Sequence, residues 1–547
     1  MENQKSKSVK SLSGKRGISF AVLIVIGLIQ AVLTVLFALA VKNLINAAEY
    51  SKGSSAVINS AIYLAVCVSL IFVFSVIYRI LHAKCQTEVE TNIKKTVIKK
   101  FISGDFGSIT KIHSGDLLSR LNTDVTTVAN VYVGLIPSLV STVAQLVAIL
   151  VALYLLQPLF TLLIVGAGVV VFLITYFIRK ITAKLHRKVR DKDGEVNSVL
   201  SETSQNAIVI KSFNAEESIA KNINAQLDGL KKFKLNQRYF TASVSSLTGL
   251  LFTAFYAVTV IYGGIAIING SQGMDFGVIV AMLQLILQIR SPLGSISSYV
   301  TAYAEMNVSL DRLYEIISQD TTTCKTAIQK ENFKQLEFND VSFGYDNDLI
   351  IKNSSFTIVK GDKVLIKGPS GVGKSTLVKL LLGLYLPNSG NVTVTADSEI
   401  STYNAKGVFS FVPQGNTLFS GTIKQNLTIN GDKVSLEDIN SALEIACAND
   451  FIKELPLGLD TVIGERGLNL SEGQAQRISI ARSILQKAPV IVLDEFTSAL
   501  DSKTESQVIN NLSALDDVTL IVISHKTEAN KICNKVIEIT DGIANIK

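Results

Sequence analysis

Six apolar stretches in the first 300 residues constrain the fold of this chain more than any other feature. They are Ile18–Val41, Ala56–Ile80, Ala129–Leu156, Leu159–Ile178, Val244–Ile268 and Phe276–Val300. Each holds about 20 residues or more, enough for a helix to cross a hydrocarbon core of about 30 Å. Only Gln157 and Pro158 separate the third stretch from the fourth, which predicts a tight membrane hairpin. We therefore predict six membrane-spanning helices in the first half.

The composition agrees with a membrane protein that also has a soluble part. Of the 547 residues, 48% are hydrophobic and 18% are charged, whereas about 25% of the residues in a typical soluble domain are charged. The cysteines are scattered and match no metal-binding spacing, so we expect free thiols in a reducing compartment. They are Cys67, Cys85, Cys324, Cys447 and Cys533.

Basic residues are concentrated on one side of the predicted membrane bundle. They crowd the N-terminal tail, the loop after the second stretch and the loop after the fourth, as in Lys94 and Arg187. The opposite side offers little beyond Lys42 and Lys52. Because basic loops stay on the cytoplasmic side, both termini and the second half are predicted to be cytoplasmic.

The second half of the chain has a different pattern. After residues 1–317 comes a polar stretch without periodicity, residues 318–334, which predicts a linker. From residue 335 to residue 547 short β-like runs alternate with helical ones, which predicts an α/β domain with a largely parallel sheet.

A glycine-rich loop provides the strongest chemical motif. Val364–Ile366 reads as a buried strand, and a strongly apolar helix follows the loop. Between them, the motif G-x-x-x-x-G-K-[ST] is formed by Gly368, Pro369, Ser370, Gly371, Val372, Gly373, Lys374 and Ser375. Such a loop wraps phosphate oxygens with backbone N–H groups, while Lys374 can reach the β- and γ-phosphates and Ser375 can bind Mg²⁺. The alternative, a glycine-rich turn with a surface lysine, does not explain the strand and helix around it.

Two further strands are predicted to end in polar residues at the same sheet edge. The apolar run Val490–Leu493 ends at Asp494 and Glu495. Asp494 would hold Mg²⁺, and Glu495 could take a proton from the attacking water. The run Val518–Ser524 ends at His525, which would reach a γ-phosphate. Taken alone, the carboxylates would be read as a capping or solvated pair and the histidine as structural.

The stretch Leu470–Gln474 reads as the start of a helix. Ser471 and Gln474 have the spacing of a capping box. Because helix N-termini attract anions, the same tip could bind phosphate. Glu472 would repel phosphate if it pointed inward, so we expect its side chain to turn away.

Taken together in this order, these motifs resemble the ABC transporter family, specifically an exporter-type half-transporter. The resemblance covers essentially the whole chain. It implies a multidomain protein with an all-α six-helix transmembrane domain of the type 1 exporter fold, followed by an α/β P-loop NTPase domain. It also implies ATP and Mg²⁺ as cofactors and a multi-pass location, which we expect to be a bacterial plasma membrane.

The resemblance assigns roles in the nucleotide site to individual residues. It implies catalytic roles for Lys374, Gln414, Glu495 and His525, and metal binding by Ser375, Gln414 and Asp494. It implies adenine stacking by Tyr345 and phosphate binding by the loop from Gly368 to Thr376. Contacts with nucleotide across a dimer are implied for Ser471, Gly473, Gln474 and Asp501.

The resemblance also implies a partner, because each ATP in this family lies between two cassettes paired head to tail. We expect a second copy of this chain, with a heterodimer with a paralogue as the alternative. The stretches His113–Val125 and Leu200–Glu217 resemble cytoplasmic loops that carry coupling helices, which dock on the ATPase domains.

The cargo is predicted from the apolar spans. Gln284 and Gln288 lie four residues apart on one helical face, and Arg290 follows them. Because an intramembrane arginine is costly, we expect these three residues to border the translocation cavity. The apolar surroundings favour an amphipathic or hydrophobic cargo, such as a peptide, lipid or drug-like molecule, moved by alternating access.

An ATP-gated channel or regulatory sensor is the alternative, and Glu495 argues against it. Six spans argue against a nucleic-acid partner.

Overall fold

The computed structural model divides the chain into two compact units. We describe residues 17–50, 53–110, 112, 114–270, 273–318, 326–328, 330–345, 348–431, 434–464, 469–515, 517–524 and 533–547. The membrane unit comprises Met1–Ile98 and Gly115–Glu315, and the cassette unit comprises Lys99–Ser114 and Ile316–Lys547. A short segment from the first half of the chain therefore belongs to the cassette unit.

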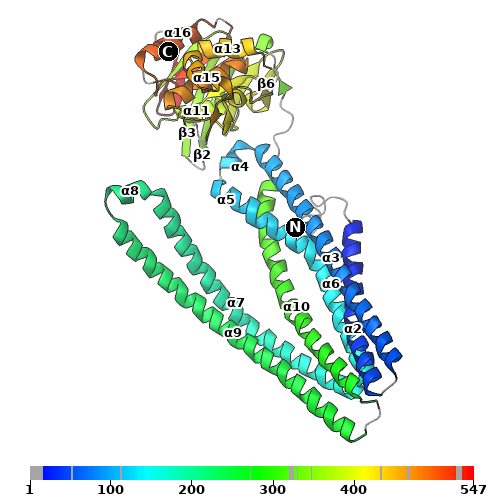
Figure 1. Cartoon of the computed structure of the whole chain (residues 1–547). Helices are drawn as coiled ribbons and strands as arrows, with labels where there is room; N and C mark the ends of the chain where they lie inside the picture. The colour runs from blue at the N-terminus through cyan, green and yellow to red at the C-terminus, as the bar shows by residue number, and fades with distance from the viewer. Residues whose placement is uncertain are drawn as a thin grey trace. The chain divides into compact units, whose positions relative to one another are not determined.

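Long helices make up the membrane unit. They are α2 (Gly17–Glu49), α3 (Ser54–Ile102), α6 (Val125–Leu156), α7 (Pro158–Gln205), α9 (Glu216–Ile268) and α10 (Phe276–Ile317), with the short α5 (Ser114–Ser119), the π-helix η1 (Arg120–Asp124) and α8 (Ala207–Ser212) between them. Pro158 stands at the first position of α7, where its missing N–H leaves no hydrogen bond unmade. In Figure 1, α7 and α9 run side by side and are joined by α8.

Five helices in the described part of the chain are long and apolar enough to cross a membrane. They lie at Ile18–Glu49, Ser54–Ile102, Gly115–Leu156, Glu216–Ile268 and Phe276–Ile317. The predicted fourth span, Leu159–Ile178, falls within α7, and most of its side chains lie outside the described part. The chain is a multi-pass membrane protein, and the number six stays a prediction.

Two main sheets form the centre of the cassette unit. The first has the order β14-β13-β4-β12-β11-β8 and is parallel except for β14. Its strands are β4 (Lys363–Lys367), β8 (Phe409–Val412), β11 (Val490–Asp494), β12 (Thr519–Ile523), β13 (Lys535–Thr540) and β14 (Ile543–Ile546). The second is antiparallel, with the order β3-β2-β5-β6. Its strands are β2 (Gln335–Tyr345), β3 (Asp348–Val359), β5 (Ser389–Thr395) and β6 (Glu399–Ser401).

Helices and short strands complete the cassette unit. The helices are α4 (Phe106–Thr110), η2 (Lys330–Asn332), α11 (Lys374–Leu381), η3 (Thr402–Asn404), α12 (Ile423–Leu427), α13 (Leu436–Ile445), α14 (Asn449–Glu454), η4 (Gly458–Asp460), α15 (Glu472–Leu485) and α16 (Ser502–Ser513). The short strands are β1 (Thr326–Ala327), β7 (Ala405–Lys406), β9 (Gly421–Thr422) and β10 (Val462–Ile463).

Strand β11 joins two hydrophobic cores. Val490 and Val492 pack into one core and Ile491 and Leu493 into the other, because successive side chains point to opposite faces of the sheet. A strand buried on both faces is continuously apolar, which is the pattern read in the sequence. In register, β11 pairs with β12 and β12 with β4, so their carboxyl ends meet at one edge.

The stretch predicted as a linker is partly built into the cassette unit. Thr326–Ala327 forms strand β1 and pairs in parallel with β7. Ile328 and Phe333 are buried in the hydrophobic core. The polar residues around them hid this packing, because the apolar side chains follow no regular period.

Candidate nucleotide site

The glycine-rich loop follows β4 and leads into α11. Gly373 caps the helix in the left-handed conformation, with φ 110°. A Cβ there would lie 2.7 Å from Cγ2 of Ile350, and one on Gly368 would lie 2.9 Å from the carbonyl oxygen of Ile539. The loop therefore requires glycine at both places, for backbone conformation and for close packing.

The side chain of Lys374 is held over the loop by backbone carbonyl groups of the loop. Its Nζ donates to the carbonyl oxygens of Gly368 at 2.8 Å and Pro369 at 2.9 Å. Its positive charge also acts on the Asp494 carboxyl at the end of β11. The ammonium is thus already positioned in the loop where phosphate oxygens could take the place of these carbonyls.

Two adjacent carboxylates lie at the end of β11. Burial raises the pKa of Asp494, and the neighbouring charge of Glu495 raises it further, whereas Lys374 lowers it. Glu495 has a positive φ of 45°, and its N–H donates to the carbonyl of Ile523 at 3.0 Å. Such a backbone is strained in a residue with a side chain, which is common at functional sites. Nε2 of Gln414 donates to Oε2 of Glu495 at 2.5 Å, so two predicted catalytic residues are in contact.

The predicted capping box at the start of α15 is confirmed. Ser471 Oγ accepts from the N–H of Gln474 at 3.2 Å, and Gln474 Oε1 accepts from the N–H of Ser471 at 2.9 Å. Glu472 is exposed in the first turn, where its charge suits the helix dipole. A contact of this helix tip with phosphate stays a prediction.

Helix α15 is also packed against the residues that follow Glu495. A Cβ on Gly473 would lie 2.7 Å from the carbonyl oxygen of Ala499. One turn further, Nε2 of the buried Gln476 donates to the carbonyl of Glu495 at 3.2 Å. Sequence reasoning missed Gln476, although a glutamine on the buried face of a helix is a signal that it has a specific partner.

Arg482 ties α15 to the segment that carries Gln414. Its guanidinium donates to the carbonyl of Thr417 at 3.2 Å and to Oγ1 of Thr417 at 3.1 Å. Burial lowers the pKa of Arg482. The position of Gln414 is thus linked to α15 through a charged hydrogen-bond donor that the sequence analysis did not single out.

Two further predicted residues, Tyr345 and Asp501, lie at the ends of secondary-structure elements. Tyr345 ends β2, is 37% exposed and packs edge-to-face against Phe343 with ring centroids 5.2 Å apart. Asp501 caps α16 by accepting from the N–H groups of Lys503 and Thr504, and these hydrogen bonds lower its pKa. His525 lies outside the described residues.

The residues present fit a nucleotide and Mg²⁺. The loop offers a cradle with an exposed Gly371, where a Cβ would meet nothing within 4 Å. The described residues contain no cluster of three or more histidine, cysteine, aspartate or glutamate side chains that could hold a metal ion. Ser375, Gln414 and Asp494 would instead supply oxygen ligands beside phosphate, which is how Mg²⁺ is commonly held. The metal would neutralise phosphate charge.

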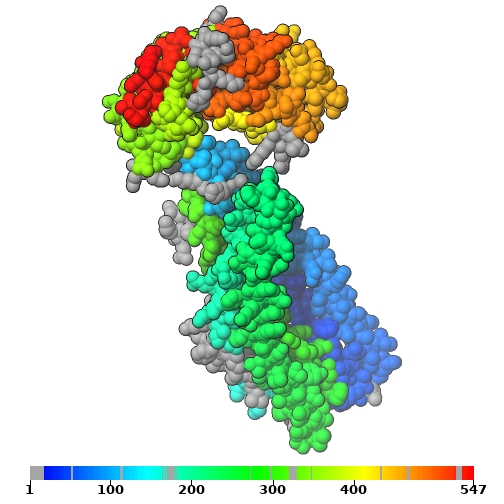
Figure 2. Space-filling view, turned by 90° about the vertical axis from the view of Figure 1, so that its left-hand side faces the viewer, coloured from blue at the N-terminus to red at the C-terminus, as the bar shows by residue number. Residues whose placement is uncertain are grey.

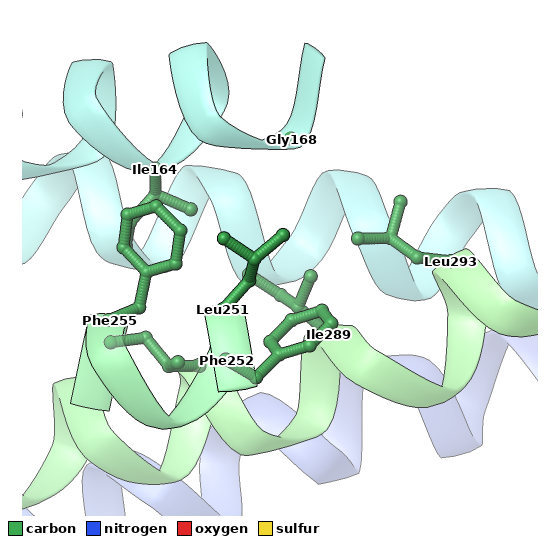
Figure 3. A pocket seen from close by; sticks show the side chains of 8 residues that line it. Ile164, Gly168, Leu251, Phe252, Phe255, Ile289 and Leu293 are labelled. Carbon is green, nitrogen blue, oxygen red and sulfur yellow. The ribbon is translucent and has the colours of Figure 1, made fainter. Parts of the chain in front are cut away.

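An apolar pocket lies between three helices of the membrane unit. Its lining, shown in Figure 3, consists of Ile164, Gly168, Leu251, Phe252, Phe255, Ile286, Ile289 and Leu293. Its volume of about 40 Å³ is far below the ~300 Å³ of the smallest typical ligand pockets. Gln284, Gln288 and Arg290 are not part of this lining. The Oε1 atoms of both glutamines are buried and have no hydrogen-bond partner among the described residues.

Known proteins resemble the chain over both units. Residues 17–293 match the ABC transporter transmembrane region, and residues 351–498 match the family described as ABC transporter. The multidrug resistance ABC transporter ATP-binding and permease protein of Lactococcus lactis subsp. lactis is 29% identical over 461 residues, which cover 83% of this chain and 78% of that protein.

Two further comparisons agree with these matches. ABC transporter B family member 1 of Dictyostelium discoideum is 29% identical over 460 residues, covering 82% of this chain and 50% of that protein, so the chain spans half of its length. The structure of a bacterial Atm1-family ABC exporter with ATP bound has a TM-score of 0.80 at 22% identity, covering 96% of this chain and 94% of that one. This last similarity shows the fold.

Proposed function

Because the chain belongs to the ABC transporter family, we propose that it exports an amphipathic or hydrophobic cargo, driven by ATP hydrolysis. The observation that carries the proposal is the hydrogen bond between Gln414 and Glu495 at the end of β11. A general base needs a polar group beside it that orients the base and the water that it activates. In this pair Glu495 would be the base and Gln414 would be the orienting group. Lys374, Ser375 and Asp494 would hold the phosphates and Mg²⁺.

The cargo class is inferred from the membrane unit. The pocket between α7, α9 and α10 is lined by aliphatic and aromatic side chains, which favour apolar ligands. Its small volume supports a cargo site that is completed by a second copy or by rearrangement of the helices. The name of the Lactococcus relative, a multidrug resistance transporter, agrees with a drug-like cargo.

The protein is proposed to act as a homodimer that alternates between two states. Ser471 and Glu472, at the tip of α15, are exposed in the described chain, so this tip is accessible to an ATP bound by a second copy. Symmetric homodimers are the commonest oligomers. Such a dimer of this chain would have two equal composite ATP sites. ATP binding would close the cytoplasmic side, and hydrolysis would reopen it, in a bacterial membrane with the cassettes cytoplasmic.

Reconstitution into liposomes tests this function. We expect ATPase activity that falls by about 10²- to 10⁴-fold in Glu495→Gln, because the general base is lost, while ATP binding persists. Uptake of lipid, peptide and dye probes into inside-out vesicles should require hydrolysis. An ATP-dependent ion current without uphill movement of any probe would instead indicate a gated channel.

A further inference from the structure

Helix α4 packs on the cassette through an aromatic contact. Phe106 lies edge-to-face against Tyr385, with ring centroids 5.6 Å apart. Oγ1 of Thr110 is 3.3 Å from the hydroxyl of the same tyrosine. In Figures 1 and 2 the light-blue segment around α4 lies directly against the cassette, and both belong to one compact unit. Tyr385 therefore contacts both ends of this short helix, at Phe106 and at Thr110.

The contact is close enough to be sensitive to one methyl group. A Cβ on Gly107 would lie 3.1 Å from Cε1 of Tyr385, which is tighter than ordinary van der Waals contact. Directly before the helix, the hydroxyl of Tyr403 donates to Oδ1 of Asp105 at 3.3 Å. The backbone of α4 at Gly107 is therefore packed closely against the ring of Tyr385.

The same ring also contacts the tyrosine expected to stack on adenine. Tyr345 and Tyr385 meet edge-to-face, with centroids 5.5 Å apart and ring planes at 84°. Phe343, which is buried, contacts both rings, at 5.2 Å from Tyr345 and 5.4 Å from Tyr385. Perpendicular ring pairs have a preferred geometry, so each ring limits the orientation of the next.

The backbone of Tyr385 is fixed to the helix that starts at the phosphate loop. Helix α11 begins at Lys374, and its end is closed by Gly383, whose φ is 64°. The N–H of Leu384 donates to the carbonyl of Lys379 at 2.9 Å. The backbone beside Tyr385 is therefore connected to the phosphate loop through α11.

We propose that Tyr385 is a positioning residue, which holds Tyr345 in the orientation that stacks on the nucleotide base and transmits displacement of α4 to it. The proposal rests on ATP being the substrate of this site. Its consequence is that α4 tunes the affinity for the base of ATP, while phosphate binding and catalysis depend on Lys374 and Glu495. Changes at Tyr385 or Gly107 should therefore alter KM for ATP more than kcat.

The first test follows the ring of residue 345 directly. The chain contains no tryptophan, so Tyr345→Trp introduces a single fluorescent reporter into the full-length protein. ATP should quench it by stacking. Adding Gly107→Ala should shift its emission before ATP is added and weaken the quenching, whereas Gly194→Ala, at a site with nothing within 4 Å of the new Cβ, should do neither. Identical spectra for both alanine variants would overturn the proposal.

The second test uses ATPase kinetics and a double-mutant cycle. Tyr385→Ala should raise KM for ATP by about 3- to 10-fold, the effect of losing one aromatic pair, with kcat nearly unchanged. Tyr385→Phe keeps the ring and should restore KM. In a Tyr345→Ala background Tyr385→Ala should have no further effect, because Tyr385 acts through Tyr345.

The outcomes separate this inference from the proposed function. If the unchanged protein hydrolyses ATP but Tyr385→Ala leaves KM as it was, or adds its full effect to Tyr345→Ala, the positioning role is wrong and the ATPase stands. If the unchanged protein neither binds nor hydrolyses ATP, the proposed function fails first.

Discussion

At the scale of single residues, the surroundings of Asp494 disfavour the charged form of its carboxyl. Burial and the charge of Glu495 raise its pKa above the ordinary value of 3.8. A raised carboxyl pKa contributes stability below the unfolded value, and that contribution is lost as pH rises through the folded value. Near neutral pH, Asp494 therefore opposes folding in the nucleotide-free protein, and a bound metal ion would relieve the repulsion.

Replacing Asp494 by asparagine should therefore stabilise the protein while abolishing its hydrolysis. Without nucleotide, Asp494→Asn should melt at a higher temperature than the unchanged protein at neutral and alkaline pH, and the gap should shrink as pH falls toward the raised pKa of the Asp494 carboxyl. Asp501→Asn is the control of opposite sign, since its carboxyl pKa is lowered by helix capping. Melting curves across this pH range, with the same trend in both variants, would contradict this explanation.

Two capping boxes in one cassette unit allow the role of Ser471 to be isolated. Ser471 caps α15 with Gln474, and Thr422 caps α12 with Gln425. Either alanine variant should lose about 1 kcal/mol of stability through its cap. Only Ser471→Ala should also weaken the dimer that forms when ATP is added to a Glu495→Gln background, because only its hydroxyl is expected to meet phosphate. Equal dimerisation of both variants, measured by light scattering, would leave Ser471 as a cap alone.

At the scale of elements, the best-predicted strands were those that carry the residues of the nucleotide site. Strands β4, β11 and β12 are short and have central residues that are apolar and buried, so their position was readable within one or two residues. The antiparallel sheet was not foreseen, because β3 mixes Lys352, Asn353 and Ser354 with apolar residues and its pairing with β2 has register shifts. Helix α4 has five residues and too little length to show a period.

An ion-pair cluster joins α5, η1 and the end of α10 inside the membrane unit. Arg312 pairs with Asp116 at 2.5 Å and with Asp124 at 3.1 Å, and Asp124 also accepts from Ser309. Arg120 pairs with Asp116 at 2.8 Å. Asp124 is 4% exposed, so these partners offset the cost of burying its carboxylate.

Removing Arg312 should therefore be strongly destabilising. Arg312→Met leaves the buried carboxylate of Asp124 without its cation, at a cost of about 3 kcal/mol, and should lower the melting temperature clearly. Lys211→Met breaks the pair with Glu216, which lies at the surface, and should leave it unchanged. If the two variants melt alike, the cluster does not hold these helices together.

At the scale of the whole molecule, the proposed dimer shares each ATP between two copies. Glu495→Gln disables the catalytic side of a composite site, and Ser471→Arg disables the side supplied by the partner. Each variant alone should be inactive. Co-expressed, half of the dimers would be mixed, and each mixed dimer would have one intact site, so about a quarter of the full ATPase activity should return. If purified mixed dimers have no ATPase activity, either the sites are not shared between copies or both sites must be intact for hydrolysis.

The order of motifs was enough to foresee a membrane half joined to an ATPase half, because each motif has a fixed chemical task. The family resemblance led us to expect a docking helix in the loop at His113–Val125, but the segment that belongs to the cassette unit is Lys99–Ser114. This assignment depends on Phe106 and Tyr385, which are 279 positions apart in a chain where neither lies in a periodic pattern.

The pairing of strand β1 determines where a cassette that folds by itself must begin. Thr326–Ala327 pairs with β7, and the N–H of Lys334 donates to the carbonyl of Thr395 at 3.0 Å. A cassette cut from the chain at Gln335 would lose this pairing and the buried ring of Phe333. A recombination event that exchanges ATPase modules between genes would therefore preserve folding only if its crossover point falls before Thr326.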